Sequence, residues 1–170
     1  MNVALDTERF HLRELVVEDA TERYLGWFAD PAAAKHIAAA TDTRALSDLR
    51  SYIRARIGRD DVLFLGIFDR ATGLHIGNIK YEPVDSDLGY AIMGILVGDP
   101  AYRGKGVAPE VLKASAQWLK AQRGITQIVL GVSHDNPGAV RAYELAGFVP
   151  EASPHMPGPH DTYLTMVLHL

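Results

Sequence analysis

The segment that most limits the folds open to this chain is a short glycine-containing stretch, residues 103–108, with the sequence RGKGVA. It lies between a stretch with the character of a strand and one with the character of a helix. Its two glycines let backbone N–H groups approach a ligand with no Cβ in the way. The helix that follows directs its unpaired N–H groups and the positive end of its dipole at the same place. The sequence therefore predicts an anion-binding turn at a strand-to-helix junction.

The charge of the whole chain gives this turn further weight. The 170 residues include 17 Lys and Arg and 21 Asp and Glu, and the formal net charge is −4. No basic run of the kind that binds nucleic acid non-specifically is present, so we expect no nucleic-acid partner. A polyanionic ligand would therefore need local positive charge to bind this chain, and Arg103 and Lys105 supply it at the turn.

The length and composition exclude several classes of protein. A chain of 170 residues predicts one domain over residues 1–170. The absence of cysteine excludes disulfides, thiolate metal sites and cysteine nucleophiles. No stretch approaches the roughly 20 apolar residues of a membrane span, and the N-terminal residues, with Asp6 and Glu8, do not resemble a signal peptide. We therefore expect a cytoplasmic protein with no membrane partner.

Hydrophobic periodicity predicts alternating strands and helices. Residues 62–68 form a nearly continuous apolar run, typical of a strand buried on both faces, and a hairpin turn at 69–73 leads into the next strand. Asn136 and Pro137 predict the start of a helix, and Gly147 predicts its end. The other predicted elements are strands at 10–15, 74–82, 88–97, 125–132, 148–151 and 163–170, helices at 17–28, 46–57 and 107–122, a helical turn at 32–37 and a turn at 83–87.

The order of these elements predicts the fold class. The middle of the chain is an antiparallel meander, and a strand–loop–helix–strand unit follows it. This combination predicts a mixed α/β (or α+β) fold, in which helices cover both faces of a mixed sheet.

Two motifs give the chain a resemblance to a known family. Residues 103–108 match every specified position of the pattern Gln/Arg-x-x-Gly-x-Gly/Ala, the signature of the GNAT superfamily of N-acetyltransferases. A second pattern of that family, Asn-x-x-Ala-x-x-x-Tyr followed by Gly-Phe, is present as Asn136, Ala139, Tyr143, Gly147 and Phe148. The chain thus resembles a GNAT acetyltransferase, which implies a central twisted sheet of about seven strands. In its N-terminal half, the segments ERFHLR at 8–13, EDA at 18–20 and WFADP at 27–31 are similar to the subgroup of the ribosomal-protein alanine acetyltransferases and the amino-sugar N-acetyltransferases.

The resemblance implies that acetyl-CoA is the cosubstrate. In this family the sheet opens between two strands, here the strand that ends near Val97 and the strand at 125–132, and the acetyl-pantetheine arm lies in the opening. The backbone of Ile95, Leu96 and Val97 would pair with the arm. Asn136 would also contact it, and a role for this side chain as a helix cap alone is the alternative. The pyrophosphate would be held by the N–H groups of Arg103, Gly104, Lys105, Gly106, Val107 and Ala108.

The implied reaction is a direct attack of a substrate amine on the thioester. A backbone N–H near Leu96 or Val97 would stabilise the oxyanion. Tyr143 matches the tyrosine of the family pattern, and a phenol with a pKa near 10 suits protonation of the leaving thiolate. Packing against the core is the alternative role for this side chain.

The general base is not apparent in the sequence. Many relatives carry a glutamate on or beside the strand that corresponds to residues 88–97, and this chain has none within it. Glu82 ranks first among the candidates, His134 has a suitable intrinsic pKa, and Asp87 is a third. A route without a base, in which the amine proton leaves through water, is the alternative.

The acceptor amine is less well defined than the cosubstrate. We expect a small molecule such as an amino sugar, because the first helix is rich in aromatic residues and a proline- and glycine-rich loop at 155–161 would cap a pocket. Tyr24 and Trp27 would lie beside this pocket, with Phe28 in the core. A peptide N-terminus is the alternative acceptor. A non-catalytic acyl-CoA-binding or sensing module and a structural interaction domain are alternatives of other classes.

Two further expectations concern metals and assembly. His155, His160 and Asp161 match no familiar metal-site spacing, so we expect no metal. The protein would be a monomer or a homodimer.

Overall fold

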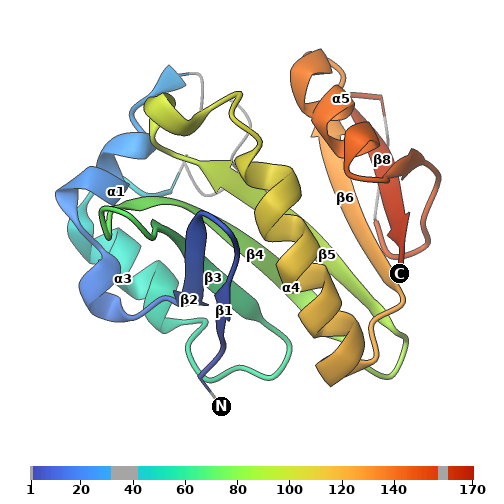
Figure 1. Ribbon diagram of the computed structural model, residues 1–170, viewed down its shortest axis with the longest axis horizontal. Coiled ribbons are helices and arrows are strands. Elements are labelled where there is room, and N and C mark those ends of the chain that lie inside the picture. Colours follow the sequence, from blue (N-terminus) through green and yellow to red (C-terminus); the bar gives the residue numbers. More distant parts are fainter. Residues whose placement is uncertain (1, 32–41, 157–160) are drawn as a thin grey trace.

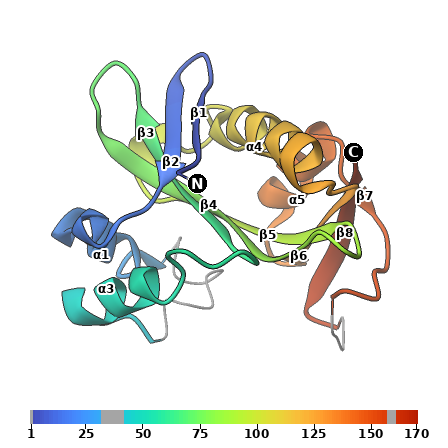
Figure 2. The ribbon, with the colours of Figure 1, turned by 90° about the horizontal axis from the view of Figure 1, so that it is seen from below.

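The computed structural model describes residues 2–31, 42–156 and 161–170, and its strands form one eight-stranded sheet (Figure 1). Figure 2 shows that α1 and α3 cover one face of this sheet and that α4 and α5 cover the other. The elements are, in chain order, β1 (Ala4–Asp6), β2 (Phe10–Glu14), η1 (Val17–Asp19), α1 (Glu22–Trp27), α3 (Leu46–Arg54), β3 (Leu63–Asp69), β4 (His75–Asp85), β5 (Tyr90–Val97), η3 (Pro100–Tyr102), α4 (Val107–Arg123), β6 (Gln127–Ser133), α5 (Pro137–Leu145), β7 (Val149–Pro150) and β8 (Tyr163–His169). The predicted fold class is confirmed, with one more strand than expected because the short β1 was not predicted.

The sheet combines an antiparallel meander with a parallel crossover. Strands β1 to β5 each pair antiparallel with the next in the chain. β5 then pairs parallel with β6, because α4 carries the chain back across the sheet. β6 pairs antiparallel with β8, which holds the short β7 on its other edge.

The sheet opens between β5 and β6. Their parallel pairing consists of three residue pairs, which join Tyr90, Ala91 and Ile92 of β5 to β6. Beyond these pairs, residues 93–97 continue along β4 while residues 130–133 continue along β8. Figure 1 shows the two strands diverging toward their carboxyl ends. The opening expected from the family resemblance is therefore present.

Two hydrophobic cores hold the helices to the sheet. The core on the α4 and α5 side includes Ile79 and Tyr81 of β4. The core under α1 and α3 includes Ile53 of α3. Because side chains alternate between the two faces of a strand, Lys80 and Glu82 of β4 project toward α3.

The N-terminal helices differ from the prediction. The helix predicted at 17–28 is instead η1 followed by α1, because Thr21 interrupts it as an N-cap: its side chain accepts a hydrogen bond from the N–H of Tyr24 (3.2 Å). The helix predicted at 46–57 ends at Arg54. The predicted helical turn at 32–37 lies outside the described residues.

The turn predicted at 83–87 is wrong. β4 continues through Pro83 to Asp85 after a cis Glu82–Pro83 peptide bond. The register with β5 shifts between Tyr81 and Val84, so Pro83, which has no N–H to donate, falls at an irregularity of the strand. The chain turns later, near Gly89, whose φ is 71°.

The helices also bear on the expectation about membranes. Within the described ranges, none of them is long and apolar enough to cross a bilayer.

Candidate active site

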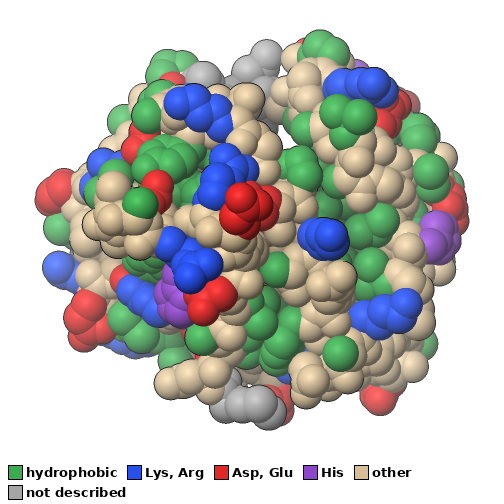
Figure 3. All heavy atoms as spheres, in the orientation of Figure 1, with side chains coloured by type: hydrophobic (Ala, Val, Ile, Leu, Met, Phe, Trp, Pro, Cys, Tyr) green, Lys and Arg blue, Asp and Glu red, His purple; other side chains and the backbone are tan. Residues whose placement is uncertain are grey.

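The glycine turn leads into α4 with the geometry that an anion site requires. Gly104 and Gly106 have φ values of 69° and 74°, in the left-handed region that favours glycine. Gly106 is the N-cap of α4, which begins at Val107. The first N–H groups of a helix have no partner within it, and they are directed at the turn together with the positive end of the helix dipole. Figure 3 shows Lys and Arg side chains gathered where the turn enters α4.

Arg9 and Glu110 hold this turn from outside the motif. The Arg9 guanidinium donates to the carbonyl oxygen of Lys105 (2.9 Å) and pairs with the Glu110 carboxylate (2.7 Å). Thr7 donates to the same carboxylate (2.6 Å). Burial acts to raise the pKa of Glu110, but the hydrogen bonds from Thr7 and Arg9 outweigh it, and the pKa lies below its usual value. No local sequence pattern marks these contacts, because the residues meet only in the folded chain.

The Arg103 side chain points toward β5. Its guanidinium donates to the carbonyl oxygens of Val97 and Gly98 (both 3.0 Å) and pairs with Asp30 (2.8 Å). Its own N–H donates to the carbonyl of Pro100 (3.3 Å). Arg103 therefore fixes the turn to the end of β5, and Lys105 is the basic side chain of the motif that remains for a bound anion.

The opening of the sheet adjoins this turn. Ile95, Leu96 and Val97 of β5 are half-buried, and they pair with β4 on one side. On the other side, within the described residues, no strand pairs with them. This edge is available to an extended ligand, which can add to an exposed strand edge by backbone hydrogen bonds.

The helix α5 borders the opening on the side of the glycine turn. The Asn136 side chain accepts a hydrogen bond from the N–H of Ala139 (3.3 Å), which confirms its predicted role as a cap. The Tyr143 ring packs edge-on against Phe148, with 5.7 Å between the ring centroids. Burial raises the pKa of Tyr143 to about 12. In the described part of the chain no buried polar side-chain atom lacks a partner and no residue bonds the Tyr143 hydroxyl, so this hydroxyl reaches the surface.

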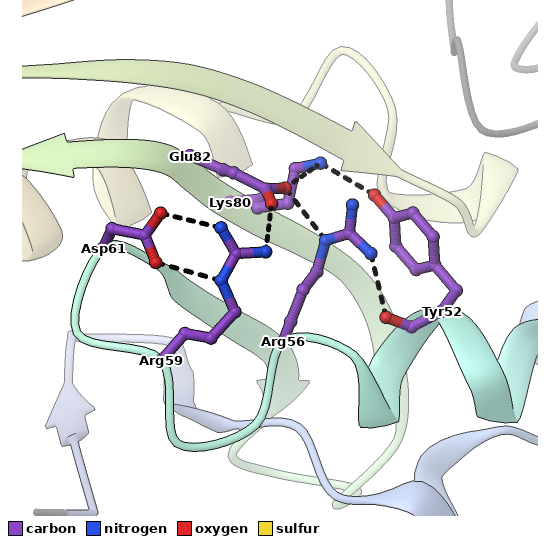
Figure 4. A network of polar contacts seen from close by, with 6 residues as sticks. All are labelled: Tyr52, Arg56, Arg59, Asp61, Lys80 and Glu82. Carbon is purple, nitrogen blue, oxygen red and sulfur yellow. Dashed lines mark hydrogen bonds and ion pairs between the residues drawn. The ribbon is translucent and has the colours of Figure 1, made fainter.

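Glu82, the first candidate base, lies in a network of cations on the α3 side (Figure 4). Its carboxylate contacts Lys80 (3.0 Å), Arg56 (2.9 Å) and Arg59 (3.1 Å). Burial acts to raise the pKa of Glu82, but Lys80 and Arg56 outweigh burial and hold the pKa below its usual value. A carboxylate stabilised in this way is a weaker proton acceptor.

Comparisons with known proteins agree with this geometry. A family profile described as an acetyltransferase (GNAT) domain matches residues 9–149. The chain belongs to the GNAT acetyltransferase family. It is therefore an acetyl-CoA-dependent N-acetyltransferase, as the two sequence motifs predicted.

Solved structures of other GNAT acetyltransferases share the fold at low sequence identity. An acetyltransferase of this family from Bacillus anthracis superposes with a TM-score of 0.80 at 17% identity, with 98% of each chain covered. Spermidine N-acetyltransferase from Vibrio cholerae, a dodecamer, has a TM-score of 0.71 at 21% identity, covering 95% of this chain and 94% of that one. RimL, a ribosomal alpha-N-protein acetyltransferase in complex with coenzyme A, has a TM-score of 0.81 at 13% identity, covering 97% and 96%.

The other candidate bases lie at opposite ends of the strands. His134 is exposed and directly follows β6, where the sheet is open. Asp87 is exposed in the turn before β5. The length of β5 separates this turn from Val97 by roughly 24 Å, at about 3.4 Å per residue. The structure thus brings His134 to the opening and leaves Asp87 far from it.

The aromatic residues of α1 belong to the core. Tyr24, Trp27 and Phe28 are all buried, and their rings contact one another. The expectation is confirmed for Phe28, and Tyr24 and Trp27 also lie in the core under α1 and α3 instead of lining a pocket.

The loop after β7 folds onto the α3 face of the sheet. The His155 ring stacks on Tyr90 of β5, with 3.7 Å between the centroids. His160 lies outside the described residues, and among those described no group of three or more His, Asp or Glu side chains has the arrangement of a metal site.

Proposed function

We propose that this GNAT acetyltransferase transfers the acetyl group of acetyl-CoA to the primary amine of a small molecule such as an amino sugar. The observation that carries the proposal is the unpaired edge of residues 93–97 beside the glycine turn. The pantetheine arm would add to this edge at Ile95, Leu96 and Val97. The pyrophosphate would bind the free N–H groups between Gly104 and Ala108, near Lys105.

The chemical step in this proposal is a direct transfer within a ternary complex. The amine nitrogen forms a bond to the thioester carbon, and the carbon–sulfur bond then breaks. An N–H of β5 near Leu96 or Val97 stabilises the oxyanion. Tyr143 donates its phenol proton to the leaving thiolate. The raised pKa of Tyr143 keeps this proton on the phenol until the thiolate leaves.

The amine must lose a proton before it attacks, since a free alkylamine is largely protonated at pH 7. We propose that this proton leaves through water, because the lowered pKa of Glu82 makes it a weak acceptor. His134 at the open end is the second candidate. A bell-shaped or inflected pH profile of kcat/KM that becomes featureless in His134→Gln would assign the base to His134 instead.

Release of free thiol from acetyl-CoA, measured with amino sugars, other small amines and N-terminal peptides, tests the proposal. Turnover with peptides alone would replace the small molecule by a protein N-terminus as acceptor. Tight binding of acetyl-CoA with no turnover for any amine would favour a sensing module. Gly106→Glu places a bulky anion in the turn and should abolish cofactor binding, so unchanged affinity would remove the turn from the site.

Tyr143→Phe tests the proton donor. We expect kcat to fall by roughly a hundredfold, within the ordinary range for general acid catalysis, while the Kd for acetyl-CoA stays within about twofold. An unchanged kcat would show that the ring only packs against Phe148, since Phe keeps that contact, whereas loss of binding and turnover together would show that the hydroxyl binds the cofactor. The wild-type rate should show no loss from Tyr143 ionisation below about pH 11, because burial raises the pKa of Tyr143 to about 12.

A further inference from the structure

If the cofactor binds at the glycine turn as proposed, the α3 side of the sheet is the side left for the acceptor. The glycine turn and α4 lie on the opposite side, which leaves that side to the cofactor. On the α3 side, β5 presents Gly94, which is exposed although it lies inside a strand. A Cβ built on Gly94 meets no atom within 4 Å. The surface above Gly94 is thus unfilled by the described residues and lies two positions from Leu96.

Lys80 lies beside this surface, and Arg56 lies beside Lys80, since both contact the same oxygen of Glu82. Lys80 is the register partner of Gly94 across β4 and β5. Its ammonium donates to the Tyr52 hydroxyl (2.7 Å), and the Arg56 guanidinium lies over the Tyr52 ring, 3.7 Å from its centroid. Tyr52 of α3 thereby holds two cations in fixed positions, Lys80 beside Gly94 and Arg56 beside Lys80.

These cations are not neutralised by their neighbours. Figure 4 shows three cationic side chains around the Glu82 carboxylate, while Asp61 binds Arg59 through both of its oxygens (2.7 and 2.9 Å). Glu82 is therefore shared between Lys80 and Arg56, and positive charge remains in excess. The side chains of Lys80 and Arg56 are 27% and 18% exposed, so solvent screens them less than it screens fully exposed charges.

We infer that Lys80 and Arg56 bind an anionic group of the acceptor, a carboxylate or a phosphate, and that the substrates are therefore small amines that also carry a negative charge. This inference rests on the proposed function. The anion would bind beside Gly94 and the amine would reach the thioester near Leu96, a separation of roughly 7 Å for two strand residues. A polyamine would meet like charge at this position.

The network also joins α3 to β4, and a purely structural role predicts a different result. If it served stability alone, loss of Lys80 would lower the rate for every acceptor by the same factor. If Lys80 binds the acceptor, its loss raises KM for anionic acceptors and leaves neutral ones nearly unchanged. Arg59 supplies the matched control, because it also contacts Glu82 but makes no contact with Tyr52.

Matched acceptor pairs test the inference and distinguish the two anions. Glucosamine 6-phosphate against glucosamine tests a phosphate, 4-aminobutyrate against its amide tests a carboxylate, and spermidine tests a polycation. We expect the wild type to prefer at least one anionic member by roughly tenfold or more in kcat/KM, the ordinary effect of one charge-assisted hydrogen bond. Lys80→Gln should abolish this preference through KM, whereas Lys80→Arg and Arg59→Gln should retain it.

The outcomes separate this inference from the proposed function. Turnover with no preference for anionic acceptors, a preference for spermidine, or an equal loss for all acceptors in Lys80→Gln would overturn the inference and leave the acetyltransferase intact. Calorimetry of the same compounds in the presence of coenzyme A supplies a readout that does not need turnover. Binding of an anionic amine that Lys80→Gln abolishes, with no acetylation, would sustain the inference and overturn the proposed function. The absence of both binding and turnover would overturn the inference and the proposed function together.

Discussion

At the scale of single residues, the glycine turn depends on side chains from the far end of the sequence. Arg9 and Glu110 are 101 positions apart, and Arg9 reaches the backbone of the turn at Lys105. Arg103 holds the other end of the turn to Val97 and Gly98. The N–H groups of the turn are thus preorganised for an anion, which lowers the entropy lost when the anion binds.

Arg9→Ala should weaken acetyl-CoA binding by roughly tenfold, because it removes a charge-assisted hydrogen bond and frees the turn. Calorimetry of acetyl-CoA binding measures the change. Arg70→Ala is the control, since Arg70 donates to the carbonyl of Thr7 (2.7 Å) in the same hairpin and does not contact the turn. Equal weakening in both variants would assign the effect to the hairpin and not to Arg9.

The lowered pKa of Glu110 gives its contribution to stability a defined pH dependence. Its contribution is present above the unfolded pKa of about 4.3 and is lost as the pH falls through the lower folded pKa. Glu110→Gln should therefore destabilise the protein relative to wild type from about pH 5 to 7, and the difference should shrink below about pH 4. Urea unfolding at a series of pH values measures it. Glu144→Gln, in an exposed pair with Arg141 (3.5 Å), should show little difference at any pH.

At the scale of elements, the accuracy of sequence-based prediction followed the range of the interactions that define each element. α5 was predicted at both ends, because Asn136, Pro137 and Gly147 act within one or two turns of helix. The predicted strand ended too early, before Pro83, because the contacts that continue β4 form only in the folded sheet: Val84 pairs with Ala91 of β5, and its N–H donates to Asp61 (2.8 Å). The glycine turn was predicted for the same local reasons as α5, and its contacts with Arg9 were not.

Gly94 in β5 and Gly98 just after β5 differ in the space available for a side chain, so substitutions at the two positions should have different effects on folding. Gly94→Val should fold normally, since its Cβ meets no atom within 4 Å and valine favours strands, but it should raise KM for the acceptor by roughly tenfold or more by filling the approach. The Kd for acetyl-CoA should not change. In contrast, a Cβ on Gly98 would enter the ring of Trp27, so Gly98→Ala should lower the unfolding temperature. Normal acceptor kinetics in a well-folded Gly94→Val would show that the acceptor binds elsewhere.

At the scale of the whole molecule, the proposed sites for the two substrates lie on opposite sides of the sheet. The turn for the cofactor is on the α4 side, and the open surface at Gly94 is on the α3 side. The chain has a net charge of −4, so its attraction for a polyanionic cofactor has to come from the turn and not from the overall field. The sequence predicted the local positive charge of the turn, and the proposed acceptor surface at Gly94 would lie on the opposite face.

Separate approaches predict the kinetic mechanism. Because the chain has no cysteine and the proposed sites give the two substrates separate entrances, acetyl transfer should require both to be bound at once. Initial velocities at varied acetyl-CoA and acceptor concentrations should give intersecting double-reciprocal lines. Parallel lines, the pattern of a covalent acetyl-enzyme, would contradict this arrangement.

The limited pairing of β5 with β6 has a mechanical consequence. The molecule can be regarded as two lobes, one from β1 to β5 and the other from β6 to β8, whose shared sheet contact is three residue pairs at one end. A pantetheine arm that bonds β5 while its neighbouring groups contact α5 would tie the free ends of the lobes together. The cofactor would then hold the two lobes together only while it is bound, and its departure would leave the amides of residues 93–97 that face away from β4 among the quickest in the sheet to exchange with solvent.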